Sequence, residues 1–574
     1  HPTASPSAQP SSQPTAVPSS QPSGQPTGEP SSIPSTQPSP VPSLSLTAAP
    51  SIVAQDINLD SLGTKGNIVF GTSNYDYVGY QVIYMGDING DKIADFSVSQ
   101  NVALESYIIY GQKEGFSDLP LSTSISSDQG FYVKNAAYAN NIRLSHLGKI
   151  NKDDKFDAFI VSTADTSDGN KGVVYIFEGQ NDPFGNIDLD NTDSYFAKIT
   201  GANDNDHTGF FIAGLGDIDG NGYPDMVIGT ESLGKAYVIL GQENFNKNID
   251  LANLSSVQGF IISSNKLVYG GYKVTFTAVG DINGDGKADY AIGIANENII
   301  YVIYGQETNI DINLDNLLPS QGFTISGNGR VGVSISKAGD QNGDEIDDFI
   351  IGVPYSNIFK GITYVFYGNS NGLSNINLDS ETLTNDKGFA IIGGVNHVAS
   401  GYSVVSDIDV NKDGIPDIAV TTAGVNSEIN TQIIFGTGQS IRSNIYLDSV
   451  VENQGLVAFS SQKYSAPQVF LSSVGDTDGN GYKDLAIGAF RAEINGVPGA
   501  GAVYLITDIY GSSTGSPSVA PTSSSPSTRP TEVPSIAPSQ TPSLVPTKSP
   551  DSTHSPTSPT SKPSAVPTVP TIMP

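Results

Sequence analysis

Aspartate and asparagine recur at alternate positions of short glycine-containing segments, a spacing that lets one loop wrap a single hard cation. The first segment runs Asp87-Ile-Asn89-Gly-Asp91-Lys-Ile93-Ala-Asp95, with side-chain oxygens at positions 1, 3, 5 and 9. A main-chain carbonyl at position 7 brings the set toward the six to eight oxygens that Ca²⁺ takes. Mg²⁺ suits the pattern less, because it demands a near-octahedral shell and gives up water reluctantly. A single copy would be no more than an Asx-rich turn that binds nothing.

The same pattern occurs six times at one period, and this repetition favours calcium binding over an empty turn. Each copy has three carboxylates and one amide, so a bound Ca²⁺ would leave about one net negative charge per loop. Without the ion, three crowded carboxylates would repel one another. The predicted ligands, with each position-7 residue contributing its carbonyl, are Asp87, Asn89, Asp91, Ile93, Asp95; Asp217, Asp219, Asn221, Tyr223, Asp225; Asp281, Asn283, Asp285, Lys287, Asp289; Asp340, Asn342, Asp344, Ile346, Asp348; Asp409, Asn411, Asp413, Ile415, Asp417; and Asp476, Asp478, Asn480, Tyr482, Asp484.

A seventh, looser copy lies between the first two and departs from the pattern. Lys149 stands where the first aspartate belongs, and Asn151, Asp153 and Asp157 follow at positions 3, 5 and 9. The Lys149 ammonium could pair with Asp153 and Asp157 and take the place of a metal ion. We therefore expect about six calcium sites, with this loop empty or weak.

The elements that position these loops are short strands that repeat in phase with them. Loops begin at 87, 149, 217, 281, 340, 409 and 476, about 59 to 69 residues apart. Each unit has four β-branched or aromatic runs bounded by Gly, Asn and Asp, typified by 79–87, 95–100, 106–112 and 129–133, without helical periodicity. A phrase of the type INLDNL (312–317) recurs as a further landmark. Seven four-stranded antiparallel units without helices predict an all-β fold, a seven-bladed β-propeller.

The order of the runs predicts how the ring closes. The first run, 67–71, is of the fourth type, and the last, about 500–507, is of the third type. The N-terminal strand should therefore complete the last blade, which removes an open sheet edge. This closure would bring residues near 52 and 511 together and send both ends of the chain out from the loop face.

An EF-hand is excluded, because the loops lie between strands and lack a glutamate at position 12. The loops are followed by phrases such as DMVIGT (225–230), DYAIGI (289–294) and DFIIGV (348–353). In this they resemble the FG-GAP repeats of the integrin α-subunit propeller, over about 460 residues. The resemblance implies a seven-bladed propeller with calcium in the hairpins between first and second strands, and a role in adhesion or recognition. Seven such loops exceed the usual number in integrins, and no inserted domain, leg domain or transmembrane helix is evident, so integrin-like heterodimer signalling is not implied.

Two arms rich in Pro, Ser and Thr, residues 1–50 and 512–574, flank the propeller at 51–511. Proline falls on every fourth residue over most of both arms, which blocks helix and sheet and leaves extended polyproline II. Such arms serve either as tethers or as densely O-glycosylated stalks. Tracts of the PSxxPT type beside a propeller resemble secreted wall or surface proteins of algae and related protists. Asn253-Leu-Ser255 is the one N-glycosylation sequon, so Asn253 is a candidate site for an N-linked glycan.

The overall composition narrows the partners and the compartment. A net charge of −31, from 58 acidic and 27 basic residues, excludes nucleic acid as a partner. Cysteine is absent, so disulfides are excluded and the redox compartment cannot be read from it. No run of 18 apolar residues predicts a transmembrane segment. The chain begins at His1, which we interpret as a processed, secreted product, extracellular and associated with the cell surface or wall.

Three functions remain open on these grounds. The first is an extracellular calcium-binding structural or adhesive protein, whose glycosylated arms assemble with other copies, or with matrix and surface proteins, into a fibre or sheath. The second is a glycan-binding lectin, although tryptophan is absent and the 26 tyrosines are explained as strand residues. The third is a propeller polysaccharide-degrading enzyme. The five histidines stand in no recognisable catalytic motif, so we expect no enzymatic activity.

Overall fold

The computed structural model describes residues 56–507 with short gaps. The gaps are 101–104, 114, 116, 122–124, 136–141, 151–156, 164–168, 182, 232–233, 268–273, 395–396, 425–427, 440–441, 452–453 and 464–468. Both arms lie outside the described residues, so the predictions of polyproline II and O-glycosylation stay predictions.

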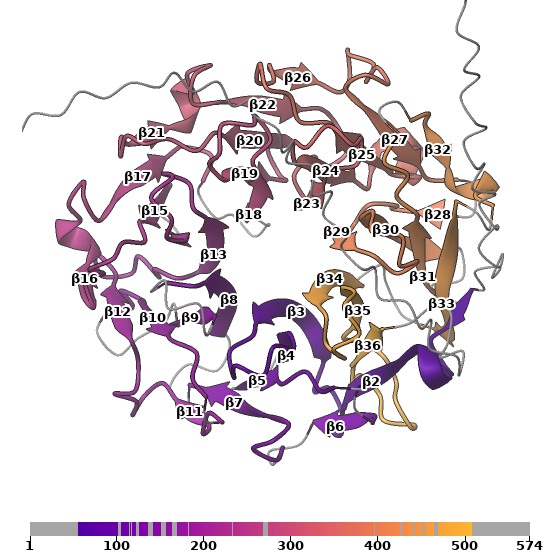
Figure 1. Ribbon diagram of the computed structural model, residues 1–574, viewed down its shortest axis with the longest axis horizontal. Coiled ribbons are helices and arrows are strands. Elements are labelled where there is room, and N and C mark those ends of the chain that lie inside the picture. Colours follow the sequence, from indigo (N-terminus) through magenta and orange to yellow (C-terminus); the bar gives the residue numbers. More distant parts are fainter. Residues whose placement is uncertain are drawn as a thin grey trace, which may run out of the picture. The chain divides into compact units, whose positions relative to one another are not determined.

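Seven sheets stand around a ring, and each is one blade whose first strand, A, faces the centre (Figure 1). Strands A to D of each blade are antiparallel neighbours, as predicted. Blades 1 to 4 consist of β3 (Val78–Gly86), β4 (Asp95–Gln100), β5 (Glu105–Ile109), β7 (Gly130–Lys134); β8 (Ile142–Gly148), β9 (Ala158–Thr163), β10 (Val173–Phe177), β12 (Ala197–Thr200); β13 (Phe211–Gly216), β14 (Asp225–Gly229), β15 (Lys235–Ile239), β17 (Gly259–Ser263); and β18 (Val274–Gly280), β19 (Asp289–Ile294), β20 (Ile299–Ile303), β22 (Gly322–Ser326). Blades 5 to 7 consist of β23 (Ser334–Gly339), β24 (Asp348–Val353), β25 (Ile362–Phe366), β27 (Gly388–Ile392); β29 (Val404–Ile408) with β28 (His397–Val398), β30 (Asp417–Gly424), β31 (Glu428–Ile434), β33 (Gly455–Lys463); and β34 (Phe470–Gly475), β35 (Asp484–Ala489), β36 (Ala502–Ile506), β2 (Gly66–Gly71).

The N-terminal strand closes the ring, and this prediction is confirmed. β2 pairs antiparallel with β36, with Gly66 opposite Ile506 and Phe70 opposite Ala502. Just beyond this pair, the Thr507 N–H donates to the Lys65 carbonyl at 3.0 Å. Blade 7 is therefore built from the last three strands and the first long strand of the propeller.

Each blade also has a fifth, very short strand that was not predicted. In six blades it is formed by the INLD-type phrase of another repeat, and in blade 7 by the sequence LPL (119–121); it pairs in parallel with strand D, on the outside of the ring (Figure 1). These strands are β6 (Leu119–Leu121), β11 (Ile187–Asp188), β16 (Asn248–Asp250), β21 (Ile312–Asn313), β26 (Ile376–Asn377), β32 (Ile445–Tyr446) and β1 (Ile57–Asn58). Short 3₁₀ turns follow four of them, η1 (Gly63–Lys65), η2 (Leu251–Asn253), η3 (Leu314–Asn316) and η4 (Leu447–Ser449). Because β1 pairs with β33, the N-terminal segment contributes to blades 6 and 7.

The fifth strands protect the outer edge of the blades. The residue before the strand accepts an N–H from strand D, as in Ile261 N to Asp311 Oδ1 at 2.8 Å and Thr324 N to Asn375 Oδ1 at 2.8 Å. Strand D would otherwise present a row of unpaired backbone groups to other chains. The phrase that looked like a simple landmark is thus an edge cap.

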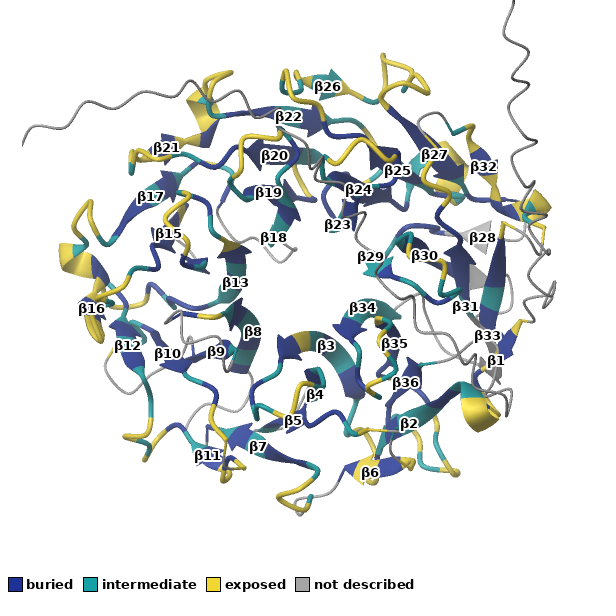
Figure 2. Cartoon of the chain, viewed as in Figure 1, coloured by how far each residue is buried: buried dark blue, intermediate teal, exposed yellow. Residues whose placement is uncertain are grey.

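The hydrophobic core lies between adjacent blades. Between blades 4 and 5, for example, Val302 and Phe323 pack with Phe349 and Ile351. The second strands are buried along their whole length, as in β19 and β24 (Figure 2), because a neighbouring blade covers each face. Such strands therefore appear in the sequence as continuous apolar runs. The element α1 (Ser356–Phe359) is a four-residue turn in which Asn357 and Ile358 have positive φ, and no described helix is long and apolar enough to cross a membrane.

Shortening a buried side chain of the closing strand should destabilise the propeller. Val69 in β2 is fully buried between blades, whereas Val257, in a turn before β17, is 70% exposed. We expect Val69→Ala to lower the free energy of unfolding by roughly 2 kcal/mol, from lost burial and the cavity left behind. Val257→Ala should change it by less than about 0.5 kcal/mol. Urea unfolding followed by circular dichroism measures both; equal effects would contradict the closure role.

Candidate metal centres

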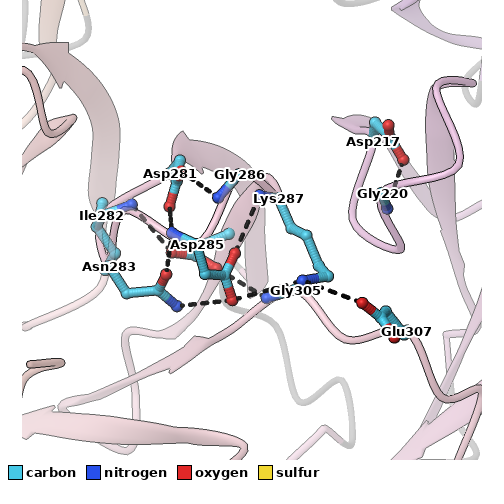
Figure 3. Close-up of polar contacts among 11 residues, drawn as sticks. Asp217, Gly220, Asp281, Ile282, Asn283, Asp285, Gly286, Lys287, Gly305 and Glu307 are labelled. Carbon is cyan, nitrogen blue, oxygen red and sulfur yellow. Dashed lines mark hydrogen bonds and ion pairs between the residues drawn. The ribbon is translucent and has the colours of Figure 1, made fainter. Parts of the chain in front are cut away.

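The six predicted loops all connect strand A to strand B, and we number each loop by its blade. In each loop the N–H of position 6 donates to one oxygen of the first aspartate, as in Gly286 N to Asp281 Oδ2 at 2.7 Å (Figure 3). Positions 4 and 6 have positive φ in all six loops, which favours the glycines found at most of them. Gly284 and Gly286 of loop 4 have φ of 69° and 85°. This backbone wraps the loop around its first side chain.

The ninth aspartate opens strand B and is buried in every one of the six loops. In loop 4, Asp289 accepts Ile282 N at 3.0 Å with one oxygen and Gly305 N at 2.7 Å with the other. The second donor is the glycine that follows strand C, and the same pair of contacts recurs in loops 1, 3, 5 and 6. In loop 7, Thr477 supplies both its N–H and its hydroxyl to Asp484. In loops 1, 3, 4, 5 and 6 the ninth aspartate therefore joins the loop to strands B and C.

Burial strongly disfavours the charged form of these aspartates. It raises the pKa of Asp225 and Asp348 to about 8 and that of Asp289 and Asp417 to about 7, from a usual 3.8, although backbone N–H groups oppose the rise. The pKa values of Asp95 and Asp484 lie well above the usual value for the same reason. A buried carboxylate with so few compensating contacts calls for a positive counter-charge. The donor set of oxygens alone is the kind that a hard divalent cation takes.

The third and fifth positions divide the loops into two groups. In loops 3 and 7, where position 3 is aspartate, carboxylate oxygens of Asp217, Asp219 and Asp225, and of Asp476, Asp478 and Asp484, all lie within 4.8 Å of one another. In loop 4, the fifth-position Asp285 accepts the Asn283 amide at 3.4 Å and Lys287 N at 3.0 Å (Figure 3). Loops 1, 5 and 6 have the same two contacts.

The seventh residues were predicted to contribute their carbonyls. In the structure, the N–H of each seventh residue donates a hydrogen bond to a side-chain oxygen of position 5, with N–O distances of 2.8–3.0 Å. This contact orders the loop at that point. Coordination by the carbonyls of Ile93, Tyr223, Lys287, Ile346, Ile415 and Tyr482 stays a prediction.

The second blade departs from the pattern further than its sequence indicated. Gly148 lies opposite Ala158, whereas Gly86, the equivalent glycine of blade 1, lies opposite Asp95. Ala158 therefore occupies the place of the ninth aspartate, and Asp157 stands one position earlier. Residues 151–156 lie outside the described part, so the predicted Lys149–Asp153 pair is not addressed. The register supports the expectation that loop 2 is empty or weak.

The Asp157 carboxylate lies against His146 of strand A, and Lys149 also acts on it through its charge. Its Oδ1 lies 3.4 Å from His146 Nε2, and its Oδ2 accepts the N–H of Asp87 in the neighbouring blade at 2.9 Å. Burial alone would raise the pKa of Asp157, but the hydrogen bond and charge of His146, with a smaller effect of Lys149, lower it. Asp157 thus takes part in a contact between blades.

Sequence reasoning missed the glycine that follows strand C. The phrases YGQ (304–306) and its equivalents were visible as strand ends, but their role at the site was not inferred. A Cβ on Gly305 would lie 2.7 Å from the carbonyl oxygens of Ala288 and Ile218, so a larger residue cannot bring its N–H to Asp289. The recurrence of Gly at one position after the third strand in six of the seven repeats was the available signal.

The sequence of the chain is similar to those of several known proteins. No family model matches the chain. It is 28% identical to integrin alpha pat-2 of Caenorhabditis briggsae over 239 residues, 38% of this chain and 18% of that protein. It is 27% identical to chicken integrin alpha-V over 256 residues, 43% of this chain and 22% of that protein. The chain is a seven-bladed propeller similar in sequence to integrin α subunits.

The similarity extends beyond these two proteins. Integrin alpha-5 of Xenopus laevis is 31% identical to the integrin α-like chain over 230 residues, 39% of this chain and 20% of that protein. Bovine phosphatidylinositol-glycan-specific phospholipase D is 36% identical over 103 residues, 17% of this chain and 12% of that protein. The chain thus spans about a fifth or less of the length of the curated relatives it matches.

The buried aspartates of the integrin α-like propeller predict an unusual pH dependence without metal. In excess chelator, the melting temperature should rise as the pH is lowered from 8 to 6. The folded chain binds protons at the ninth aspartates with pKa values of about 7 to 8, whereas the unfolded chain would bind them near 3.8, so protonation favours folding. This stabilisation is lost as the pH rises through 7 to 8. Differential scanning calorimetry measures it, and a melting temperature that falls on acidification would contradict the assignment.

Proposed function

We propose that the protein is an extracellular calcium-binding structural or adhesive protein with a rigid propeller head. The observation that carries the proposal is the set of six A–B loops, each holding an oxygen-only donor set beside a buried aspartate whose pKa is raised. The carboxylate groups of loops 3 and 7, gathered within 4.8 Å, support it further. Calcium would supply the positive charge that these carboxylates lack.

Each ion would be held by the side chains at positions 1, 3, 5 and 9 and the carbonyl at position 7. Because the ninth aspartate also contacts strand C, a bound ion would stiffen three parts of the blade together. Cysteine is absent from the chain, so calcium would take the stabilising role that disulfides have in many secreted proteins. We expect about six such ions, with loop 2 without one.

The integrin relatives support an extracellular, adhesion-type role for the head. We propose that the proline-rich arms carry O-linked glycans and assemble the protein into a fibre or sheath, with other copies or with matrix and surface proteins as partners. Asn253 lies exposed in η2 and donates its amide to Asp250 Oδ2 at 2.9 Å, so an N-linked glycan there would replace that contact. Absence of enzymatic activity stays a prediction.

Removal of calcium should lower the melting temperature markedly at pH 7.5. Each site that is filled at a hundred times its dissociation constant adds about 2.7 kcal/mol to the stability. Asp285→Asn should remove part of this gain, because it neutralises one ligand of loop 4, whereas Asp193→Asn, at an exposed residue outside the loops, should keep it. Scanning fluorimetry across a calcium series measures the shifts. An identical melt in chelator and in calcium would refute the proposal.

A cavity favours glycan binding as a second candidate function. It has a volume of about 870 Å³ and opens among the A–B loops of blades 7, 1 and 2. Its lining includes Tyr84, Tyr482 and the lysines Lys92, Lys149 and Lys483. Tyrosine faces stack on sugar rings, and lysines bind acidic or hydroxyl groups of saccharides.

A glycan array separates the two candidates. If the cavity is a sugar site, the protein should bind a defined set of glycans, and Tyr84→Ala should weaken that binding by at least about tenfold, the effect of about 1.4 kcal/mol. Tyr75→Ala, at an exposed tyrosine that does not line the cavity, should leave it unchanged. No binding to any glycan would leave the structural or adhesive role alone.

A further inference from the structure

Two aspartates outside the predicted ligand sets reach across to a loop of the preceding blade. They are Asp157 and Asp347, and each directly precedes strand B of its own blade in the sequence. Asp157 Oδ2 accepts Asp87 N at 2.9 Å, and Asp347 Oδ2 accepts Asp281 N at 3.0 Å. In return, Asp157 N donates to the Asp87 carbonyl at 3.0 Å and Asp347 N to the Asp281 carbonyl at 3.2 Å. Two reciprocal hydrogen bonds thus clamp the first residue of loops 1 and 4.

The same three parts surround both contacts, which argues against coincidence. A basic side chain of strand A, two residues before the loop glycine, lies against each carboxylate. His146 Nε2 is 3.4 Å from Asp157 Oδ1, and Lys337 Nζ is 2.8 Å from Asp347 Oδ2. The two carboxyl side chains are only 16% and 25% exposed. The basic side chain of strand A therefore orients the carboxylate that reaches across.

A glycine makes room for each contact. A Cβ on Gly86 would lie 2.4 Å from Asp157 Oδ2, and one on Gly280 would lie 2.2 Å from Asp347 Oδ2. These glycines directly precede Asp87 and Asp281 and have φ of 74° and 86°. The carboxylate can approach the backbone only because no side chain stands there.

The other blades provide an internal comparison. At the equivalent position, Ala94 and Ala288 keep the backbone half of the clamp, with N–H contacts of 2.9 Å to the carbonyls of Asp476 and Asp217. They have no carboxylate to offer the first residue of loops 7 and 3. Pro224 and Pro416 have neither group, since proline lacks an N–H. The carboxylate clamp is thus confined to loops 1 and 4.

We propose that Asp157 and Asp347 are positioning residues for the cation sites of loops 1 and 4. Each holds the backbone of the first ligand in place and adds a negative charge beside the site without being a ligand itself. Partners of this kind typically change metal affinity by about 10- to 100-fold when removed. Loops 1 and 4 should therefore bind calcium more tightly than loops 3 and 7. The inference rests on the proposed calcium binding.

The experiment follows hydrogen exchange by mass spectrometry on the full chain across a calcium series. Peptides from each loop report their own calcium midpoint, so one molecule contains its own controls. In Asp347→Ala, the midpoint of the peptide spanning 281–289 should rise about tenfold or more, while that of 217–225 stays at the wild-type value. Asp157→Ala should do the same for 87–95 only. Asp347→Asn, which keeps an acceptor oxygen, should shift the loop 4 midpoint less than alanine does.

The outcomes separate this inference from the calcium proposal. A wild-type chain in which no loop responds to calcium would overturn the calcium proposal itself. A calcium response in the wild type with an unchanged loop 4 midpoint in Asp347→Ala would overturn the positioning role alone. An equal shift in every loop would show a general loss of stability and would also overturn it. If the alanine variant does not fold, Asp347→Asn decides by the same loop 4 against loop 3 comparison.

Discussion

The structure depends on one buried carboxylate in each of six blades, the aspartate that opens strand B. Asp289 shows why, because its two oxygens join the start of its loop, at Ile282, to the end of strand C, at Gly305. No other side chain in the blade ties these two points together in this way among the residues described. A charged group in this place is costly in a protein interior, and a bound cation, as proposed above, would offset that cost. The carboxylate oxygens that would bind the cation are therefore the same atoms that hold the loop to strand C.

Neighbouring loops are also joined to one another by backbone contacts. Gln306 N donates to the Ile218 carbonyl at 2.8 Å, and Asn369 N donates to the Ile282 carbonyl at 2.9 Å. These two loops are thus hydrogen-bonded to the residues that follow strand C of the next blade. The loops on this face are therefore connected to neighbouring blades by backbone hydrogen bonds and are not isolated turns.

Much of this arrangement could be predicted from local patterns. The repeat period predicted seven blades, and the second strand was placed at 95–100, where β4 lies. The closing strand was predicted because the first and last runs were of complementary types. Two-residue strands such as β21 could not be predicted in this way, because only the edge of a distant strand D makes them strands. Loop 2 was misaligned by one residue, since Asp157 suits the spacing and only the pairing of Gly148 with Ala158 reveals the insertion.

The double closure at the N-terminus has a consequence for synthesis. β1 finds its partner only when β33 exists, and β2 finds its antiparallel partner only when β36 exists, since Gly66 lies opposite Ile506, about 440 positions later. At about 5–20 residues per second, translation leaves the side of β2 that faces β36 without its native neighbour for roughly 20 to 90 seconds. During that interval it is an open β-edge that another nascent chain could pair with. Correct folding therefore requires that β2 does not pair with another chain before β36 has been synthesised.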